Sequence, residues 1–365
     1  MPVILGDCRA VLPTLDAGSV RCCVCSPPYW GLRDYGTATW EGGSAECGHS
    51  ARTGDLRFTH PISDKQKSNA GSAGSAGSAG SECTSCGARR IDAQLGLERT
   101  PEEYVAAMVS VFREVRRVLA DDGTLCLNLG DSYNAYNGNR GASHGANKGH
   151  LDIMPRLPQD VGLTCPTLKP KDLVGIPWRV AFALQADGWY LRSDIIWAKP
   201  NPMPESVTDR PTKSHEYVFL LSKGARYFYD AVAIAENSIR AGCIPLGSRK
   251  INETPHADGK HEQFGKARLA PVPDTRNART VWTIPTQPTP DAHFATFPEA
   301  LAERCILAGS APGDAILDPF FGSGTVGKVA ERLGRKWTGI ELNPAYVGIS
   351  ERKTAQRGLF ASGAE

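Results

Sequence analysis

The sequence predicts an α/β fold in which a mostly parallel sheet is covered by helices on both faces. Two observations support this prediction. Short apolar runs, which are typical of buried strands, alternate with longer segments whose apolar residues recur at helical spacing. The run Val20–Cys25 is apolar at nearly every position, as expected for a strand that is buried on both faces.

Length and composition set wider limits. A chain of 365 residues holds one large domain or two modest ones, and 41% hydrophobic with 22% charged residues is an ordinary globular balance. A net charge of +2 neither requires nor excludes a nucleic-acid partner. No run approaches the roughly 18 apolar residues of a membrane span, and the start MPVILGD lacks the layout of a signal peptide. We therefore expect a cytoplasmic protein without a membrane partner, in which cysteines such as Cys22, Cys23 and Cys25 are small buried hydrophobes rather than disulfide partners.

The elements follow in order. After the strand at 20–25, Thr100 and Pro101 begin a helix that continues to Leu119, because a capping residue, a first-turn proline and early acids are typical of a helix start. Asp122-Gly123 then predicts a turn before a strand at 124–129. Further strands are expected at 190–197, 216–221, 315–317 and 336–340, and further helices at 173–186, 298–308, 326–333 and 344–356.

Two long segments do not follow this alternation. Residues 134–172 are rich in Gly, Asn, His and Lys, and residues 237–281 contain eight Lys or Arg against four Asp or Glu. Loops of this length inside a compact domain are usually functional or disordered. The repeat AGSAGSAGSAGS at 70–81 is expected to be a flexible tether.

A glycine-rich turn lies in the stretch AILDPFFGSGTVG at 315–327. Gly322, Gly324 and Gly327 match G-x-G-x-x-G between a predicted strand and a predicted helix, and Glu341 ends the next strand. This context favours a nucleotide-binding turn, because glycines let the backbone approach the ligand and an acid can bind a ribose diol. The pattern fits NAD or another adenosine-containing cofactor. Asp318 favours the latter, since a carboxylate before the glycines suits an amino or sulfonium cation better than a pyrophosphate.

The motif SPPYW, Ser26–Trp30, ends the first strand in a stiff way. Neither proline has an N–H to donate to a strand ladder. Taken alone, the motif favours a binding site, and a rigid strand exit with packed aromatic rings is the alternative.

Together, SPPYW and DPFFGSGT (Asp318–Thr325) resemble the DNA amino-methyltransferases that use S-adenosylmethionine, and their order resembles the permuted β group of that family. Supporting stretches are Gly6-Asp7, NLGDSY at 128–133, WAKPNPMPES at 197–206, SHEYVFLLSK at 214–223 and HFATFPEAL at 293–301. The resemblance covers almost the whole chain. It is weakest in an insert at 41–90 and in the two long segments. It implies a Rossmann-like class I methyltransferase fold with a seven-stranded sheet, acting on double-stranded DNA.

The resemblance also implies roles for the matching residues. Ser26 Oγ and the Pro27 carbonyl would accept hydrogen bonds from the target amino group, Pro28 would stiffen the turn, and Tyr29 would stack on a flipped-out base. S-adenosylmethionine would contact a second set, with Glu341 at the ribose and Asp7 near the adenine: Asp7, His293, Thr296, Phe297, Asp318, Pro319, Phe320, Gly322, Ser323, Gly324, Thr325 and Glu341. His293 fits a packed loop histidine equally well.

The motifs also bear on the target atom. Methylation at cytosine carbon 5 needs a thiolate, usually presented in Pro-Cys, and this chain has only the reverse order at Cys165-Pro166. Serine at the first motif position resembles enzymes that act on cytosine N4; adenine N6 stays the alternative, because serine also occurs there. We therefore expect a sequence-specific N4-cytosine DNA methyltransferase, bacterial or phage-encoded, of the kind found in restriction–modification systems. A cognate restriction endonuclease or none, and a monomer or a homodimer, stay open.

Two short Cys/His pairs flank the tether. Cys47-Gly48-His49 and Cys83-Thr84-Ser85-Cys86 offer four ligands of the type that binds a structural Zn²⁺ tetrahedrally. The first pair is tightly spaced, and His60 is an alternative ligand. Four unrelated surface residues are the other interpretation.

Basic and polar residues in or beside the long segments are expected to contact DNA, mainly at phosphates. The candidates are Lys199, Asn201, Arg210, Lys213, Arg249, Lys250, Arg276 and Arg279. A solvated loop is the alternative for the basic stretch at 237–281. The predicted division of the chain is a catalytic domain at 1–40, 96–133 and 173–236, a zinc insert at 41–95, a DNA-contact loop at 134–172, a basic target-recognition loop at 237–281 and a cofactor-binding part at 282–365.

Two other functional classes account for part of the sequence. An NAD-dependent oxidoreductase would explain the glycine turn but leaves SPPYW without a role. A non-catalytic zinc-bearing DNA-binding protein would explain the Cys pairs and the basic loops but not a complete cofactor site. The methyltransferase accounts for both motifs.

Overall fold

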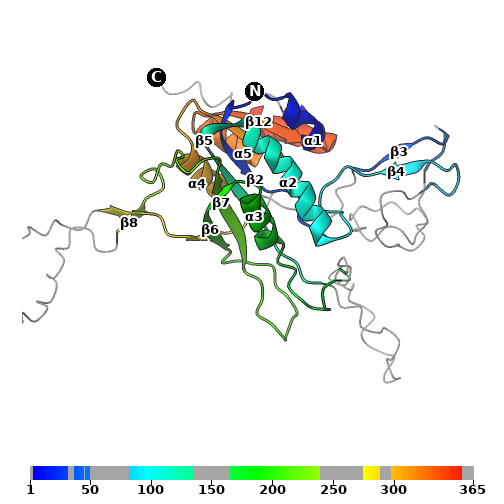
Figure 1. Cartoon of the computed structure of the whole chain (residues 1–365), viewed down its shortest axis with the longest axis horizontal. Helices are drawn as coiled ribbons and strands as arrows, with labels where there is room; N and C mark the ends of the chain where they lie inside the picture. The colour runs from blue at the N-terminus through cyan, green and yellow to red at the C-terminus, as the bar shows by residue number, and fades with distance from the viewer. Residues whose placement is uncertain are drawn as a thin grey trace, which may run out of the picture.

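An eight-stranded sheet forms the centre of the computed structural model, which describes residues 3–31, 37–44, 46–49, 82–134, 165, 167–238, 274–287 and 297–355 (Figure 1). The strand order is β1-β12-β11-β2-β5-β7-β6-β10. β7 runs antiparallel to both of its neighbours and the other adjacent pairs are parallel, which confirms the predicted mostly parallel sheet. The bounds are Val3–Leu5 (β1), Val20–Cys25 (β2), Leu119–Leu129 (β5), Tyr190–Ala198 (β6), His215–Ser222 (β7), Val281–Thr283 (β10), Ala315–Asp318 (β11) and Lys336–Glu341 (β12).

The expectation of seven strands is wrong by one, because β10 adds an eighth. Val281–Thr283 pairs in parallel with Ile196–Ala198 of β6. Trp282 is buried, and its indole N–H donates to the Arg279 carbonyl over 2.8 Å. Three residues are the lower limit of strand length, so the element has too short a pattern to stand out in the sequence.

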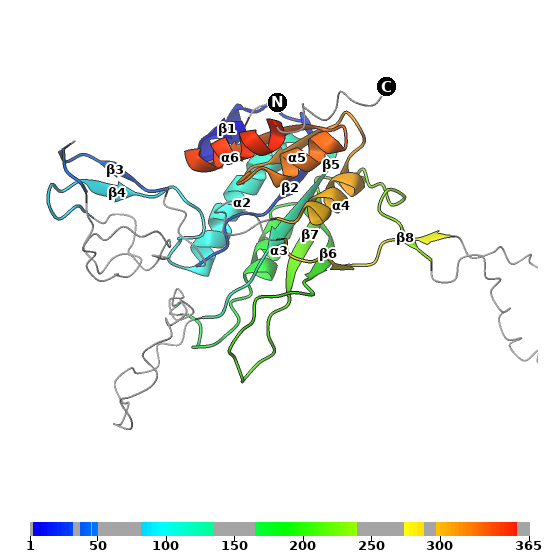
Figure 2. The ribbon, with the colours of Figure 1, turned by 180° about the vertical axis from the view of Figure 1, so that it is seen from behind.

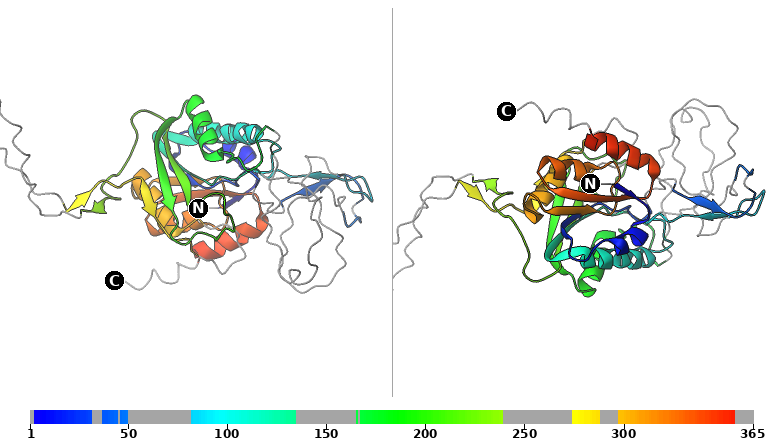
Figure 3. Two further views of the ribbon diagram at one scale, coloured as in Figure 1. Left: turned by 90° about the horizontal axis from the view of Figure 1, so that it is seen from below. Right: turned by 90° about the horizontal axis from the view of Figure 1, so that it is seen from above.

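Helices cover both faces of the sheet (Figures 2 and 3). Successive residues of β2 point into opposite cores: Cys23 and Cys25 pack with α2 and α3, and Cys22 and Val24 pack with α4 and α5. This explains why β2 is apolar on both sides. In the described part of the chain, no helix is long and apolar enough to span a membrane. The bounds are Cys8–Val11 (α1), Leu12–Thr14 (the 3₁₀ helix η1), Pro101–Val118 (α2), Ile176–Ala186 (α3), Glu299–Gly309 (α4), Thr325–Arg332 (α5) and Pro344–Ala355 (α6).

The start of α2 lies where the sequence predicts it, because a capping residue marks it. Thr100 caps α2, and its Oγ1 accepts a hydrogen bond from the Glu103 N–H over 3.1 Å. The predicted turn at Asp122-Gly123 is wrong, because these residues lie inside β5. The register of β5 against β2 shifts between Val20 and Cys22, so the turn-forming residues produce an irregularity in the ladder rather than a break.

Two small antiparallel ribbons extend from opposite sides of the sheet domain (Figures 1 and 2). One pairs Thr39–Glu41 (β3) with Arg89–Ile91 (β4), and the other pairs Glu236–Asn237 (β8) with Thr275–Arg276 (β9). The first ribbon carries the Cys/His pairs and the second lies at the start and end of the basic segment. The pairing of β3 with β4 and that of β8 with β9 therefore fix the positions of these two ribbons' strands.

Candidate active site

The chain changes its direction of winding between β2 and β11. It passes from β2 through α2 to β5 on one side, and from β11 through α5 to β12 on the other. Open α/β sheets bind ligands at such a switch point, beyond the carboxyl ends of the strands. A cavity of about 630 Å³ lies there. Ser26–Tyr29 follows β2, and Asp318 ends β11 with Pro319 and Phe320 after it; both stretches line this cavity.

A hydrogen-bonded cluster surrounds the Ser-Pro-Pro-Tyr turn. The Tyr29 hydroxyl donates to Glu216 Oε2 over 2.7 Å and lies 3.2 Å from Ser26 Oγ. Asn128 Nδ2 lies 2.7 Å from the Tyr29 hydroxyl, 3.0 Å from Glu216 Oε2 and 3.2 Å from Ser26 Oγ. The backbone of the turn is also held by α2, because the Tyr104 hydroxyl donates to the Pro28 carbonyl over 2.9 Å. These contacts fix the positions of the Ser26 and Tyr29 side chains.

Glu216 is a largely buried carboxylate, with 16% of its side chain exposed, and a cation lies beside it. Burial by itself would raise its pKa, but the Lys199 ammonium, which donates to Glu216 Oε1, and the hydrogen bonds from Tyr29 and Asn128 hold the pKa below its ordinary value. The Lys199 Nζ also lies 4.3 Å from the Trp197 ring centroid. The cluster therefore contains an ionised acceptor at neutral pH.

The glycine turn after β11 has the conformation that its sequence requires. Gly322 and Gly324 have φ values of 52° and 83°, in the left-handed region that favours glycine. The Gly322 N–H donates to Glu341 Oε2 and the Asn343 N–H donates to Glu341 Oε1, both over 2.7 Å. Burial raises the pKa of Glu341 and these N–H groups oppose that rise. The acid is thus fixed at the end of β12 with its carboxylate on the cavity wall.

Asp318 is a second buried acid, 4% exposed, at the end of β11. Burial raises its pKa to about 8; the Phe320 N–H, which donates to Asp318 Oδ1 over 3.0 Å, opposes the rise and the charge of Glu341 adds to it. In the described part of the chain no Lys or Arg forms an ion pair with Asp318. A cationic ligand in the cavity would supply the missing charge.

Most of the predicted cofactor residues line this one cavity. Asp7 is among them, although its carboxylate also caps α1 and forms an ion pair with Arg9 at 2.6 Å. Gly324 instead occupies the N-cap of α5, and it is not a lining residue. His293 and Thr296 lie outside the described residues. The lining members of the predicted set are Asp7, Phe297, Asp318, Pro319, Phe320, Gly322, Ser323, Thr325 and Glu341.

The predicted DNA-contacting residues divide into groups. Lys199, Asn201 and Lys213 line the cavity. Arg210 lies beyond it, with its guanidinium 3.9 Å from the Tyr133 ring centroid and an ion pair of 2.6 Å to Glu205.

The other four basic residues belong to the second ribbon and the basic segment. Arg276 and Arg279 both form ion pairs with Glu236, at 3.5 and 2.9 Å. Arg249 and Lys250 lie outside the described residues. The residues beside the family motifs are therefore the ones that the fold brings to the site.

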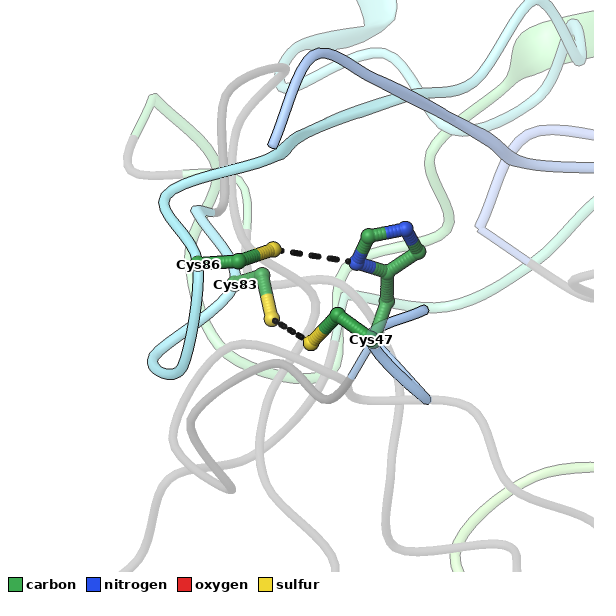
Figure 4. Close-up of side chains that lie close together, drawn as sticks. Cys47, Cys83 and Cys86 are labelled. Carbon is green, nitrogen blue, oxygen red and sulfur yellow. Dashed lines mark hydrogen bonds between the residues drawn. The ribbon is translucent and has the colours of Figure 1, made fainter. Parts of the chain in front are cut away.

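The four Cys/His residues meet at the far end of the first ribbon. Their ligand atoms all lie within 4.8 Å of one another. Cys47 Sγ is 3.7 Å from Cys83 Sγ, and Cys86 Sγ is 3.2 Å from His49 Nδ1 (Figure 4). Four ligands about 2.0–2.3 Å from a tetrahedral Zn²⁺ would be separated by roughly 3.5–3.8 Å. Backbone groups of Ala88 and Ser44 hydrogen-bond to Cys86 and lower its pKa, whereas the contact with Cys86 raises the pKa of Cys47 to about 11. A bound Zn²⁺ would therefore have to displace a proton from Cys47.

Asn128 and Glu216 are two further residues of the site that the sequence did not predict. Both lie within stretches that support the resemblance, but each reaches the SPPY turn only through sheet pairing. A signal was present in each case. Asn128 is the polar residue within the apolar run LCLNL, and Glu216 is the acid just before the apolar run YVFLL. A polar group inside a buried strand indicates a specific hydrogen-bonding partner.

Comparisons with known proteins agree with this geometry. The family model described as DNA methylase, for N6 and N4 methyltransferases, matches residues 20–352. Type II methyltransferase M.Cfr9I of Citrobacter freundii is 42% identical over 345 residues, which cover 94% of this chain and 84% of that protein. Type II methyltransferase M.SmaI of Serratia marcescens is 41% identical over 356 residues, covering 97% and 91%.

The fold has solved counterparts. The PvuII DNA methyltransferase (cytosine-N4-specific) superposes with a TM-score of 0.53 and 17% identity, covering 99% of this chain and 86% of that one. A Thermus thermophilus structure in complex with S-adenosyl-L-methionine has a TM-score of 0.51 and 19% identity, covering 100% and 95%. The arrangement of the sheet is thus that of a class I methyltransferase. With the SPPY turn and the glycine turn lining one cavity, the chain belongs to the N6/N4 DNA methylase family of S-adenosylmethionine-dependent DNA amino-methyltransferases.

Proposed function

We propose that this protein transfers a methyl group from S-adenosylmethionine to the exocyclic N4 of a cytosine flipped out of double-stranded DNA. One observation carries the proposal. A single cavity combines a stiff turn of hydrogen-bond acceptors, Ser26–Tyr29, with the buried acids Asp318 and Glu341. The acceptors suit an amino group, and the acids suit a ligand with a cation and a ribose. Adenine N6 is the alternative target, and the serine at position 26 favours cytosine.

The Ser-Pro-Pro-Tyr turn would make the target amino group a better nucleophile. The lone pair of an exocyclic amino group is delocalised into the ring, so the nitrogen is a poor nucleophile. Acceptors that bind its two hydrogens, here Ser26 Oγ and the Pro27 carbonyl, favour a pyramidal nitrogen whose lone pair attacks the methyl carbon in line. The C–S bond breaks, its electron pair returns to sulfur, and the nitrogen loses one proton, which gives S-adenosylhomocysteine and the methylated base.

The cofactor half of the cavity has fitting groups for each part of the ligand. Asp318 offers a carboxylate to the amino or sulfonium cation, and Glu341, fixed by two backbone N–H groups, accepts from the ribose hydroxyls. Asp7 and Phe297 both line the cavity. Asp7 would lie near the adenine, and Phe297 would cover the methionine end. His293 and Thr296 belong to the same proposed closing segment.

DNA would approach across the open side of the cavity. Lys199, Asn201 and Lys213 lie on its wall, and Arg210 lies just beyond. We assign phosphate contacts to the segments 134–172 and 237–281, with Arg249 and Lys250, because cations position a protein on DNA without specifying sequence. Arg276 and Arg279 would join them only by exchanging Glu236 for a phosphate. The recognised sequence would define a restriction–modification specificity, with or without a partner nuclease.

Zn²⁺ is proposed as a structural ion at Cys47, His49, Cys83 and Cys86. The spacing of the four ligand atoms supports this, since two Cys/His pairs converge from both ends of the insert. The ion would hold the insert at 41–95 together, and no step of methyl transfer passes through it.

Product analysis tests the proposed function. Unmethylated DNA incubated with the protein and S-adenosylmethionine is expected to yield N4-methyldeoxycytidine when digested to nucleosides and analysed by mass spectrometry. Ser26→Ala is the matched control; losing one acceptor should lower the rate by roughly 10²-fold or more without weakening cofactor binding. N6-methyldeoxyadenosine as the sole methylated nucleoside would overturn the cytosine assignment. Binding of NAD in place of S-adenosylmethionine would overturn the enzyme class.

A glycine beside the turn offers a second test. A Cβ added at Gly130 would lie 2.5 Å from Tyr29 Cε2, so Gly130→Ala must displace the Tyr29 ring. We expect the methyl-transfer rate to fall by roughly 10²-fold, because misplacing a group by about 1 Å has effects of that size, while calorimetric affinity for S-adenosylmethionine is unchanged. Gly348→Ala in α6 is the control, since its added Cβ meets only Arg352 Nη1 at 3.7 Å. Equal activity of both variants would contradict the proposed role of Tyr29.

A further inference from the structure

The cluster around the SPPY turn has a definite order of hydrogen-bond donors. The Glu216 carboxylate is held by Lys199 on its Oε1 side, and its Oε2 receives the Tyr29 hydroxyl at 2.7 Å. Ser26 Oγ lies 3.2 Å from the Tyr29 hydroxyl oxygen. Ser26, Tyr29 and Glu216 thus form a hydrogen-bonded series along the wall of the cavity.

The chemistry of the groups fixes the direction of this series. An ionised carboxylate only accepts, so the single Tyr29 hydrogen goes to Glu216. The Tyr29 oxygen can then only accept, and the Ser26 hydroxyl donates its hydrogen to Tyr29. A lone pair on Ser26 Oγ is left for the cavity. Asn128 supports this order, because its Nδ2 donates to the Tyr29 hydroxyl and so also treats the Tyr29 oxygen as an acceptor.

We propose that the ion pair of Glu216 and Lys199 sets the direction of a hydrogen-bond relay through Tyr29, so that Ser26 faces the target amino group as an acceptor and not as a donor. Glu216 and Lys199 are positioning residues in this proposal. It rests on the proposed methyl transfer and deepens it, since it names what makes the serine hydroxyl an acceptor.

The reverse order would be unproductive. If Glu216 were protonated, it could donate to the Tyr29 oxygen, and Tyr29 could donate to Ser26. The Ser26 hydrogen would then turn to the cavity and oppose the hydrogens of the amino group. A neutral acid at position 216 is therefore expected to slow the reaction without removing any group that touches the substrate.

The charges near Glu216 come from several elements. Lys199 follows β6 and is its direct partner, and Lys213 precedes β7 and adds a second positive charge. Asp131 and Glu205 lie near Lys213, and the Lys213 ammonium donates to the Asp131 carbonyl over 2.7 Å. Burial lowers the pKa of Lys213. Lys199 is thus the charge that most directly opposes the effect of burial on Glu216.

The pH dependence of the rate tests the relay. Single-turnover rates are measured between pH 5.5 and 8.5 with saturating S-adenosylmethionine and DNA, so that weaker binding does not contribute. For the wild type, Glu216 stays ionised and this group produces no acid limb in that range. For Lys199→Met, burial dominates and the acid limb is expected to move up by about 1–3 pH units, so the rate rises with pH toward neutrality. Lys199→Arg keeps the charge and should keep the wild-type profile.

Glu216→Gln gives a second readout. Because the Lys199 ammonium only donates, it holds the amide oxygen, so the amide N–H groups face Tyr29 and donate to its oxygen. The order of the relay is then reversed at every pH. We expect a rate lowered by about 10²-fold, a flat profile, and unchanged affinity for S-adenosylmethionine, with circular dichroism as the check on folding. An unshifted profile for Lys199→Met, or a wild-type rate for Glu216→Gln, would overturn the relay while N4-methylation by the wild type stands. No methylated nucleoside from the wild type would instead refute the proposed function itself.

Discussion

S-adenosylmethionine is expected to bind more tightly as the pH rises from 6 to about 7.5, below the ordinary pKa of an α-amino group, and Asp318→Asn is expected to remove most of this dependence. In the free protein, burial and the charge of Glu341 raise the pKa of Asp318 to about 8, so at pH 6 this carboxyl group is largely protonated. A cationic ligand favours the ionised form. Binding below pH 8 must therefore release a proton, and the affinity increases with pH until the free carboxyl group is itself ionised.

The measurement is calorimetry in two buffers with different enthalpies of ionisation, which reports the protons released on binding. For the wild type we expect up to one proton released at pH 6.5 and fewer at pH 9. Asp318→Asn cannot release it and also loses a charged contact of about 1.5–3 kcal/mol, which corresponds to roughly 10–100-fold weaker binding. Glu341→Gln is the control, because the ribose it faces is neutral; it should bind more weakly and keep most of the proton release, since burial is the largest cause of the raised Asp318 pKa. A pH-independent wild-type affinity would refute the assignment of Asp318 to the cation.

The same carboxyl group predicts the pH dependence of stability without ligand. Between its ordinary pKa of 3.8 and its raised pKa of about 8, folded Asp318 holds a proton that the unfolded chain has lost. The free energy of unfolding should therefore decrease as the pH rises through this interval, as far as this group contributes. Thermal unfolding of Asp318→Asn should lack this contribution.

The sequence predicted the parts of the site that depend on local pattern. The backbone geometry of SPPYW and of DPFFGSGT can be predicted from a few residues, because prolines restrict the backbone angles and glycines permit unusual ones. The alternation of strands and helices then places both at one edge of a parallel sheet, as the structure has them. The rule that open α/β sheets bind ligands beyond the carboxyl ends of their strands was sufficient to predict that the two motifs share a site.

What the sequence did not predict depends on pairing between distant strands. Glu216 reaches Tyr29 across 187 positions of sequence, and only the register of β7 against β5 brings it there. The raised pKa of Asp318 likewise follows from burial, which no local pattern expresses. Arg276 and Arg279 looked like free cations in the sequence, whereas both pair with Glu236. Long-range contacts decide which charges are available to a ligand.

Zinc removal is expected to have the largest effect on the accessory part of the protein. Purified protein should contain one Zn²⁺ per chain by elemental analysis, and Cys83→Ser or His49→Ala should lose it. His49→Cys is the matched control, because a Cys₄ set also binds zinc tetrahedrally. Structural zinc contributes about 10–16 kcal/mol of apparent binding free energy in small domains, so the insert should become sensitive to limited proteolysis once the metal is lost.

The effect should reach the active site through the base of the ribbon. Thr37 Oγ1 donates to Asp92 Oδ1 over 3.0 Å, and Arg9 Nη2 donates to the Ala93 carbonyl over 2.7 Å. Gln94, which follows, is buried and lines the cavity. We therefore expect zinc-free protein to keep its sheet by circular dichroism and to retain S-adenosylmethionine binding, while methylation of DNA falls steeply. Full methylation by a metal-free Cys83→Ser variant would refute this role, and a zinc content of zero in the wild type would refute the site.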